Sequence, residues 1–307
     1  MASKTYILCP GQGAQEPGMG RSFFEAHAVA RQTFEEAGRL LGFDLADLCF
    51  NGPVERLNQT DVSQPAIYTT SVACHRAAVA AGKINPADAS EYAGLSLGEY
   101  TALHLAGVFS FETGLRLVAS RGKLMQEAAM RVPSSMVAVI GGDEATISKL
   151  CAEASAGEVL VPANFNAPGQ IVVSGSKAAC ERFTQAATSA GLRAVPLSVA
   201  GAFHSPLMQP AADAMSRELE TAEMSPPTSP VWSNVTAEHH RDVASIRKLL
   251  VEQIVKPVRW EQTMAKLANQ ADVRFVELAP GKVLTGLLRR QNRRARIETL
   301  ESAQTLA

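Results

Sequence analysis

The sequence has no excess of charge of either sign. Lysine and arginine together number 29 and aspartate and glutamate 30 among 307 residues, which gives a formal net charge of -1. Proteins that bind nucleic acid through its phosphates usually carry a clear basic excess. The overall balance therefore argues against nucleic acid as a partner.

Long apolar runs are also missing. No uninterrupted stretch approaches the ~20 residues that a helix needs to cross a bilayer. The first residues lead straight into a strand-like run at 5–9, without the apolar region and cleavage pattern of an export signal. We therefore expect a cytoplasmic protein that does not enter a membrane.

Cysteine is scarce and scattered. The five cysteines stand at positions 9, 49, 74, 151 and 180, an odd number with no C-x-x-C pair. Zinc sites and disulfide frameworks use closely spaced or even-numbered sets, and thiols stay reduced in cytoplasm. We expect five free thiols and no metal site.

The sequence does contain a regular alternation of strand and helix patterns. Hydrophobic residues make up 46% and charged residues 19%, as in an ordinary globular domain with a buried core. The pattern predicts strands at 5–9 and 90–93, helices ending near 39 and over 66–80, and an amphipathic helix from a Ser110 N-cap to about 130. Beyond 200 it predicts a helix after Pro206, a strand near 231–233, a helix over 243–255 and a strand at 273–277. This order is typical of an α/β fold.

The segment between these two halves has a different pattern. Strands are predicted at 136–140, 159–164, 171–174 and 194–199, with helices capped by Asp143 and Ser176 between them. The order βαββαβ is that of a ferredoxin-like unit. We therefore predict an α/β fold in which residues 1–130 and 200–307 form a large α/β-hydrolase-like domain with a parallel sheet. Residues 131–199 would form an inserted ferredoxin-like subdomain.

Ser96 is the first candidate for chemistry. It is the centre of Gly94-Leu95-Ser96-Leu97-Gly98, which follows a predicted strand and precedes a helical run, as in a nucleophile elbow. The glycines leave room for a strained turn that exposes one hydroxyl. The N–H of Leu97, at the start of the helix, is placed to donate to an oxyanion. A helix-capping serine in a Gly-rich turn is the structural alternative.

A serine hydroxyl needs a base to take its proton, and His204 is the best of six candidates. It lies between a strand and a helix start with Ser205 as N-cap and Pro206 in the first turn. The histidines at 27, 75, 104, 239 and 240 fall in helical patterns or a polar turn, where surface or packing roles account for them. A solvated loop residue is the alternative for His204.

Arg121 interrupts an apolar stripe on the helix predicted after Ser110. Positions 117, 118, 124 and 125 are Leu, Val, Leu and Met, and they lie on its own face of the helix. Positions 116, 120, 123 and 127 already form a solvated face. The guanidinium of Arg121 should therefore point inward, where it needs an anion. A core carboxylate or the carboxylate of a bound substrate would satisfy it.

Together these residues resemble the malonyl-CoA:acyl carrier protein transacylases of fatty-acid synthesis. Six blocks occur in the family's order over nearly the whole chain, and the set is far more specific than any one block. The blocks are Pro10-Gly11-Gln12-Gly13, Gly94-Leu95-Ser96-Leu97-Gly98-Glu99-Tyr100, Ser120-Arg121-Gly122, Gly201-Ala202-Phe203-His204-Ser205, Lys256-Pro257-Val258-Arg259-Trp260 and Pro280-Gly281-Lys282-Val283-Leu284.

The resemblance implies an acyl carrier protein S-malonyltransferase and a role for each site residue. Ser96 would be the nucleophile and His204 its base, a dyad in place of a triad. Gln12 and Leu97 would supply backbone N–H groups to the oxyanion hole, and Arg121 would hold the malonyl carboxylate. No metal or cofactor is expected, since malonyl-CoA is a substrate and backbone donors polarise its carbonyl.

The resemblance extends to the pocket walls, with two departures. The backbone carbonyl of Gln253 would orient the histidine, Asn164 would be an active-site asparagine, and Phe203 would disfavour α-methyl substituents. The family usually has histidine just before the nucleophile, where this chain has Leu95. That change alters pocket polarity and rate and leaves the nucleophile, base and oxyanion donors in place. Ala279 stands where glycine is common, a smaller change.

The expected reaction is ping-pong, with malonyl-CoA and acyl carrier protein as partners of a monomer. A serine hydrolase or thioesterase with the same elbow, and a discrete acyltransferase of a polyketide assembly line, stay open as alternatives. A non-catalytic carrier-docking protein is a third, suggested by Leu95 and by a basic run that a solvated face explains more simply. The basic run is Arg289, Arg290, Arg293, Arg294 and Arg296.

Overall fold

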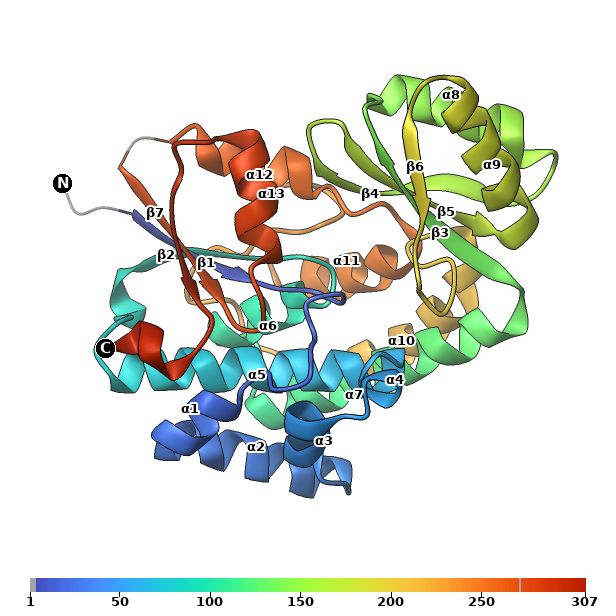
Figure 1. The fold of residues 1–307 in the computed structure, drawn as a ribbon. Coiled ribbons are helices and arrows are strands. Elements are labelled where there is room, and N and C mark those ends of the chain that lie inside the picture. The colour runs from blue at the N-terminus through green and yellow to red at the C-terminus, as the bar shows by residue number, and fades with distance from the viewer. Residues whose placement is uncertain (1–3, 271) are drawn as a thin grey trace.

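A computed structural model of the chain describes residues 4–270 and 272–307. Its first sheet is four-stranded and parallel throughout, with the strand order β2-β1-β7-β8 (Figure 1). The strands are β1 (Lys4–Cys9), β2 (Ala89–Gly94), β7 (Val273–Leu278) and β8 (Arg296–Leu300). Since parallel strands end at one edge, the loops that follow β1 and β2 lie next to each other there.

Strand β1 shows why helices cover both faces of this sheet. Alternate side chains of a strand point to opposite faces. Ile7 and Cys9 pack into one hydrophobic cluster, and Tyr6 and Leu8 into another. All four are 1% exposed or less, so the sheet is a buried middle layer, as parallel sheets normally are.

The helices outside the segment 134–196 form layers above and below this sheet. In Figure 1, α12 and α13 lie above it, and the long helices α5 and α7 lie side by side below it. The helices are α1 (Arg21–Ala26), α2 (Ala28–Leu41), α3 (Leu45–Asn51), α4 (Val54–Leu57), α5 (Thr60–Ala80), α6 (Gly98–Leu105), α7 (Phe111–Arg131), α10 (Gln209–Thr221), α11 (Val243–Val255), α12 (Trp260–Ala268) and α13 (Val283–Gln291). Short 3-10 turns span Pro86–Asp88, Pro206–Met208 and Ala303–Leu306. No helix in the described part of the chain is both long enough and apolar enough to span a bilayer.

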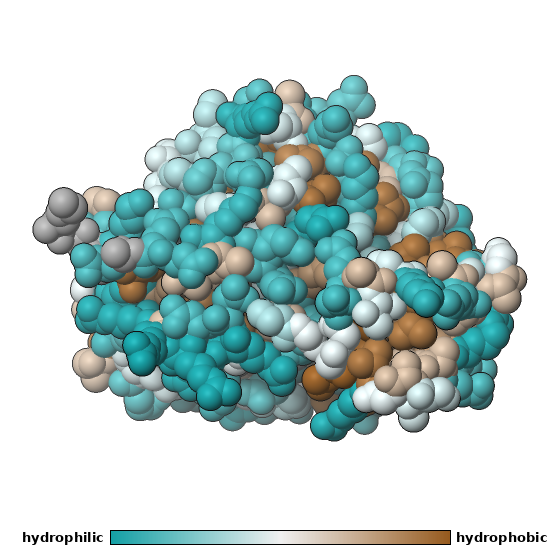
Figure 2. All heavy atoms as spheres, turned by 90° about the horizontal axis from the view of Figure 1, so that it is seen from above, coloured by the Kyte–Doolittle hydropathy of each residue, from teal (hydrophilic) through white to brown (hydrophobic). Residues whose placement is uncertain are grey.

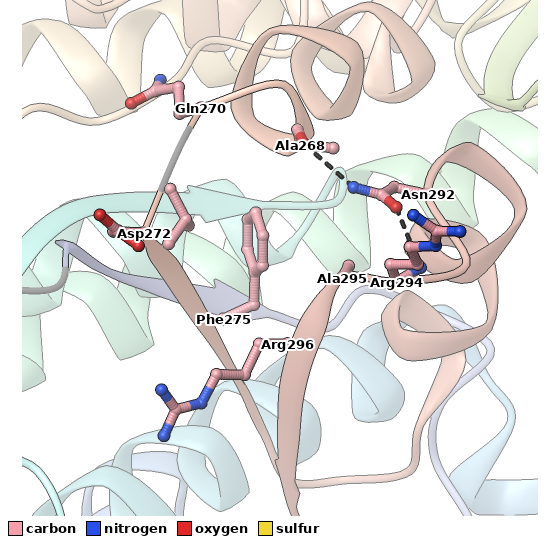
Figure 3. Close-up of a pocket in the computed structure, with 9 residues that line it drawn as sticks. Ala268, Gln270, Asp272, Phe275, Asn292, Arg294, Ala295 and Arg296 are labelled. Atoms are coloured by element: carbon pink, nitrogen blue, oxygen red, sulfur yellow. Dashed lines mark hydrogen bonds between the residues drawn. The ribbon is translucent and has the colours of Figure 1, made fainter.

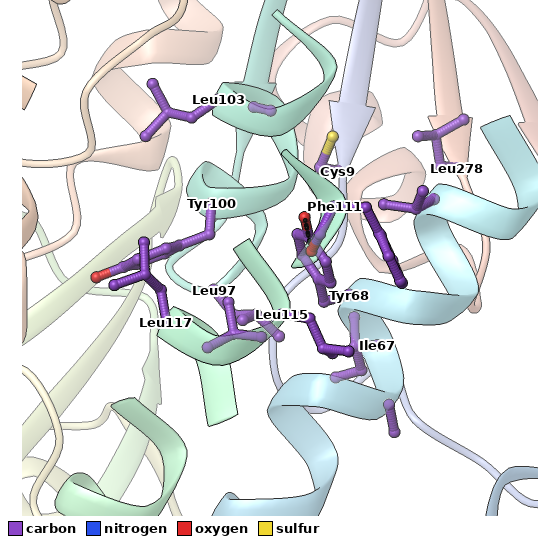
Figure 4. Close-up of a cluster of buried hydrophobic side chains, with 14 of the residues drawn as sticks. Cys9, Ile67, Tyr68, Leu97, Tyr100, Leu103, Phe111, Leu115, Leu117 and Leu278 are labelled. Atoms are coloured by element: carbon purple, nitrogen blue, oxygen red, sulfur yellow. Dashed lines mark hydrogen bonds between the residues drawn. The ribbon is translucent and has the colours of Figure 1, made fainter. Parts of the chain in front are cut away.

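The core below the carboxyl edge of the sheet anchors α6, the helix that follows Ser96. Figure 4 shows Leu97 beside Leu115 of α7 and near Ile67 of α5, with Leu103 one turn further along α6. All four are fully buried. Burying one such side chain contributes about 1.5–3 kcal/mol, so the start of α6 is held firmly against the helices below.

The second sheet is antiparallel, with the strand order β4-β5-β3-β6. Its elements are β3 (Ser134–Ile140), α8 (Glu144–Ser155), β4 (Leu160–Ala167), β5 (Gln170–Ser176), α9 (Lys177–Ser189) and β6 (Arg193–Pro196). Both helices pack on one face of the sheet over a separate hydrophobic cluster that includes Ile147, Phe165 and Phe183. Backbone hydrogen bonds from Phe165 N to Val258 O (2.9 Å) and from Val258 N to Ala163 O (2.8 Å) join β4 to the segment between α11 and α12.

The molecular surface is mainly polar. Figure 2 looks down from the top of Figure 1 and shows hydrophobic side chains gathered on the right-hand half, where the second sheet lies. Large hydrophobic side chains that are more than about a third exposed in the described residues come from separate elements. They are Phe43, Val54, Met130, Val132, Val195 and Val283. Scattered exposed apolar residues of this kind are normal for a globular protein.

The predicted α/β fold with a parallel sheet is confirmed, and so are three predicted helix starts. The side chains of Ser110, Asp143 and Ser176 each accept a hydrogen bond from the backbone N–H three residues on, at 3.0, 2.8 and 3.2 Å. These are the bonds by which an N-cap residue satisfies a free donor of the first turn.

Three predicted elements are wrong in extent. The helix expected over 66–80 begins at Thr60 and runs through Pro65, because nearly all of its side chains are buried and packing outweighs the missing proline N–H. The strand expected near 231–233 is reduced to two isolated bridges, Val231 with Tyr92 at the edge of the sheet and Trp232 with His239. The strand expected at 194–199 ends at Pro196. Strand β8 and helices α3, α4, α12 and α13 had no counterpart in the prediction.

Candidate active site

The turn after β2 holds Ser96 in a strained conformation. Its φ is 51°, in the left-handed region that residues with a Cβ rarely adopt. A Cβ on Gly94 would lie 2.0 Å from the Gly98 carbonyl oxygen, and one on Gly98 would lie 2.1 Å from the oxygen of Cys9. Both positions therefore require glycine. Ser96 does not cap α6, since Leu97 is the N-cap residue.

The hydroxyl of Ser96 lies against His204. The distance from Ser96 Oγ to His204 Nε2 is 2.9 Å, and His204 Nδ1 lies 2.6 Å from the backbone oxygen of Gln253. A carbonyl oxygen only accepts hydrogen bonds, so Nδ1 of the neutral ring carries the hydrogen and Nε2 is left as an acceptor. The ring is thus held in the tautomer that takes the serine proton.

The surroundings of His204 keep it neutral. The side chain is 4% exposed, and burial, followed by the positive charge of Arg121, lowers its pKa to about 4. Its hydrogen bond to the Gln253 carbonyl acts in the opposite direction. At pH 7 the ring is therefore available as a base.

Arg121 points inward, as its helical position predicted, and it meets only neutral oxygens. Its side chain is 1% exposed, with Nη1 donating to Gln64 Oε1 at 2.7 Å and Nη2 donating to Gln253 Oε1 at 2.8 Å. Nη2 also lies 3.1 Å from Ser96 Oγ. Among the described residues no carboxylate forms an ion pair with this guanidinium. Its charge is left for an anion that binds beside Ser96.

Two backbone N–H groups lie at the elbow without protein acceptors. In the described chain neither Leu97 N nor Gln12 N donates to another residue. The loop that carries Gln12 is pressed against the elbow, since a Cβ on Gly11 would lie 2.2 Å from the Leu95 oxygen. These are the donors that an oxyanion formed at Ser96 would require.

The site opens into a cavity of about 420 Å³ between the two sheets. Ser96, Arg121 and His204 line it, together with Gln12 from the loop after β1 and Leu95 from the turn after β2. Strands β3, β4 and β5 of the second sheet contribute Met136, Asn164, Asn166 and Val172 to its walls. The segment that follows β6 contributes Leu197, Ser198, Val199, Ala200 and Phe203. Every site residue predicted from the sequence except Leu97 and the fully buried Gln253 lines this cavity.

Four residues of the site were not predicted. Gln64 holds Arg121, Asn234 accepts from Ser96 N at 2.6 Å, and Glu99 and His240 hydrogen-bond each other at 2.7 Å behind them. Glu99 stood inside a recognised block, and His240 was assigned to a polar turn. Their side chains are fully buried, which no spacing in the sequence signals.

A second cavity, of about 500 Å³, lies at the other end of the sheet (Figure 3). Phe275, Arg294 and Arg296 line it near the amino ends of β7 and β8, whereas Ser96 follows the carboxyl end of β2. Part of the basic run therefore faces away from the nucleophile. No group of three or more metal-ligating side chains occurs among the described residues.

An α/β fold with a strained elbow serine, a histidine on its hydroxyl and free backbone donors beside it is typical of enzymes that use a serine nucleophile. Residues 5–306 match the acyl transferase domain family. The chain belongs to this family, and within it to the malonyl CoA-acyl carrier protein transacylases.

Relatives of known name and structure agree over the full length. The malonyl CoA-acyl carrier protein transacylase of Salmonella typhimurium is 45% identical over 285 residues, 92% of this chain and 91% of that protein. The solved structure of the enzyme of that name from Coxiella burnetii superposes with a TM-score of 0.95 at 37% identity, covering 100% of this chain and 96% of that chain. The structure of a malonyl-transacylase in complex with its type II PKS acyl-carrier protein superposes with a TM-score of 0.94 at 41% identity, covering 99% of this chain and 98% of that chain.

Proposed function

We propose that this chain transfers the malonyl group of malonyl-CoA to the phosphopantetheine thiol of acyl carrier protein through an ester on Ser96. The observation that carries the proposal is that Ser96 Oγ lies within hydrogen-bond distance of both His204 Nε2 (2.9 Å) and Arg121 Nη2 (3.1 Å). One contact supplies a base, and the other supplies a fixed positive charge next to the reacting oxygen. The names of the relatives supply the donor and the acceptor.

The first half-reaction forms the ester. Ser96 Oγ attacks the thioester carbonyl carbon while His204 Nε2 takes the hydroxyl proton. The negative charge that develops on the carbonyl oxygen is stabilised by the N–H groups of Gln12 and Leu97. The carbon–sulfur bond then breaks, and CoA leaves as a thiol with the proton from His204.

The second half-reaction reverses these steps with a different thiol. His204 takes the proton of the phosphopantetheine thiol, the sulfur attacks the ester carbonyl, and Ser96 recovers its proton. Every step uses groups of this chain and the two substrates, so the reaction needs neither metal nor cofactor. All of the residues come from one chain, which makes a monomer sufficient.

Arg121 and Phe203 set the acyl group that is accepted. The malonyl carboxylate pairs with the buried guanidinium of Arg121. No carboxylate of the described residues forms an ion pair with that guanidinium. Phe203, 6% exposed in the cavity wall, limits the space for an α-methyl branch. Asn164, also in the wall, offers an amide to the substrate.

The acceptor has one alternative that a specific observation favours. The neighbour whose structure includes a type II PKS acyl-carrier protein is 41% identical to this chain, in the same range as the other relatives. A polyketide carrier is therefore the second candidate acceptor. Comparing acyl carrier proteins of the two pathways as acceptors, at equal concentration, distinguishes them.

The finer description of the molecule is part of the same proposal. The order βαββαβ and the antiparallel arrangement β4-β5-β3-β6 support a ferredoxin-like subdomain at 131–199. The elbow at the end of β2 supports an α/β-hydrolase-like domain made of 1–130 and 200–307. A cytoplasmic location stays a prediction.

Intact mass after mixing the protein with malonyl-CoA tests the proposed function. We expect a malonyl adduct that an acyl carrier protein thiol removes. Ser96→Ala should abolish the adduct and leave the fold intact, because the hydroxyl makes little packing contact. A hydrolase would instead release malonate without accumulating an ester, and an unmodified mass without thioester loss would leave only a docking role.

A further inference from the structure

A buried carboxylate behind the site takes no part in the reaction described above. Glu99 stands in the first turn of α6 and is 0% exposed. Its oxygens accept hydrogen bonds from Gln253 Nε2 at 2.7 Å, His240 Nε2 at 2.7 Å and Asn234 N at 3.0 Å. His240 is its one basic neighbour within ion-pair distance among the described residues. A buried carboxylate is costly, and these three donors compensate for the cost. What the protein gains by keeping the carboxylate there needs an explanation.

One of those donors, Gln253, contacts all three reacting side chains or their backbone. Its backbone oxygen fixes His204 Nδ1, its Oε1 accepts from Arg121 Nη2, and its Nε2 donates to the backbone oxygen of Ser96 at 3.0 Å. The residue is fully buried in α11. A rotation of its side-chain amide would disturb Arg121 and the elbow together.

Glu99 and Arg121 together fix which way that amide faces. The guanidinium of Arg121 can only donate, and a carboxylate can only accept. Gln253 therefore presents Oε1 to Arg121 and Nε2 to Glu99 and the Ser96 backbone oxygen. Without the carboxylate, Nε2 loses one of its two acceptors, and the amide is held less firmly.

A second donor, Asn234, connects Glu99 to the elbow itself. The side chain of Asn234 accepts from Ser96 N at 2.6 Å and donates to Gly94 O at 2.7 Å, so it bridges the turn. The backbone N–H of Asn234 donates to Glu99. Glu99 thus holds the residue that braces the nucleophile and the residue that orients the base.

We propose that Glu99 is a positioning residue. Supported by His240, it holds Ser96, His204 and Arg121 in their relative positions through Gln253 and Asn234. The inference rests on the proposed function of this site. It predicts that Glu99 affects the rate of ester formation and the preference for a carboxylated acyl group, without touching the substrate.

The test compares Glu99→Gln with the parent protein by the rate of acyl-adduct formation from malonyl-CoA and from acetyl-CoA. We expect kcat for malonyl transfer to fall about 10–100-fold, as for a small misplacement of reacting groups. The change in KM should be much smaller, and the malonyl-to-acetyl ratio should fall because Arg121 loses its fixed acceptor. A parent protein that forms no adduct refutes the proposed function instead.

Glu277→Gln is the matched control. Glu277 is also 0% exposed, but it accepts from Leu284 N and Thr285 N at 2.8 and 2.7 Å, away from the site. Glu277→Gln should lower the free energy of unfolding and leave the malonyl-to-acetyl ratio at the parent value. A folded Glu99→Gln protein with parental rate and ratio overturns the proposal, as does an equal loss of ratio in Glu277→Gln.

A milder pair keeps the proposal testable if Glu99→Gln does not fold. His240→Leu removes one donor from Glu99 and leaves those from Gln253 and Asn234, whereas His240→Gln offers a replacement N–H. We expect His240→Leu to slow malonyl transfer on the order of 10-fold and His240→Gln to restore most of it. Equal and parental rates in both folded variants would show that His240 does not support the site.

Discussion

His204 determines the pH range in which the site can react. Burial and the charge of Arg121 lower its pKa to about 4, and a general base acts only when it is unprotonated. We therefore expect kcat/KM for malonyl-CoA to stay level from pH 7 to about pH 5 and to fall tenfold per unit below about pH 4. Initial rates across pH 3.5–8 measure this pH dependence, and far-UV circular dichroism shows whether the protein is folded at each pH. An acid limb centred near pH 6.5 would mean that the base is not buried as described.

Leu95 separates the rate of the reaction from its selectivity. Its side chain lies in the cavity wall beside Ser96, where the family usually has histidine. Leu95→His adds a polar group there without moving Arg121 or Phe203, to which selectivity is assigned. We expect the rate of malonyl transfer to change and the malonyl, methylmalonyl and acetyl preferences to stay as in the parent. A switch of preferred acyl group would assign selectivity to position 95 as well.

At the scale of the element, the turn between β2 and α6 has no room for an additional side-chain atom at Gly98. A Cβ at Gly98 would lie 2.1 Å from the oxygen of Cys9, the last residue of the neighbouring strand β1. Gly98→Ala must therefore separate the turn that carries Ser96 from the end of β1 and the loop with Gln12 that follows it. We expect a loss of about 1–3 kcal/mol in the free energy of unfolding, as for other overpacked sites, and a large loss of ester formation. Denaturant unfolding and adduct mass measure the two effects.

Gly286→Ala is the control for that substitution. Gly286 lies in α13, and a Cβ there would meet nothing within 4 Å. Alanine in a helix interior is favoured over glycine by about 0.5–1 kcal/mol, so this variant should be slightly more stable and fully active. Equal damage from both substitutions would mean that crowding at the elbow does not explain the effect of Gly98→Ala.

The elements that the sequence predicted well are those with strong local signals. The N-caps at Ser110, Asp143 and Ser176 and the alternating strand patterns need no knowledge of the fold. Strand β8 was missed because its charged start, Arg296, reads as part of a basic run. The beginning of α5 was missed because Pro65 reads as a helix breaker, and only tertiary packing overrides it.

The site was predictable to the extent that its residues carry motifs or break a pattern. Ser96 lies in a motif, and Arg121 breaks an apolar stripe. Asn234 and His240 do neither, because their contacts join segments more than 130 residues apart in the chain. The long-range pairing that makes them important leaves no local signature.

At the scale of the whole molecule, acid should weaken the fold. Burial lowers the pKa of His75, His104 and His204 to about 4, whereas unfolded histidine titrates near 6.5. Between these values the unfolded chain binds more protons, so the free energy of unfolding falls as pH falls from 6.5 toward 4. We expect a loss of about 1–2 kcal/mol per histidine at pH 5 relative to pH 7. Urea unfolding at both pH values measures it, and the dependence should be weaker in His75→Gln.

The arrangement of the two sheets explains how one cavity can both select and react. Ser96 follows β2 of the first sheet, and Met136, Asn164 and Val172 of the second sheet line the same cavity. Among the described residues that line the cavity, Arg121 is the one with a permanent positive charge that could pair with a substrate carboxylate. The central claim of a carboxylated acyl group therefore depends on that side chain.

The most direct test is the ratio of malonyl to acetyl transfer in Arg121→Ala. Truncation leaves the malonyl carboxylate without its partner in a buried site, with a penalty of about 2–5 kcal/mol, and malonyl transfer should collapse. Acetyl-CoA has no such carboxylate, so its transfer should fall far less or rise, and the ratio should drop steeply. A folded Arg121→Ala protein in which both rates fall in parallel would contradict the account, because the arginine would then be structural.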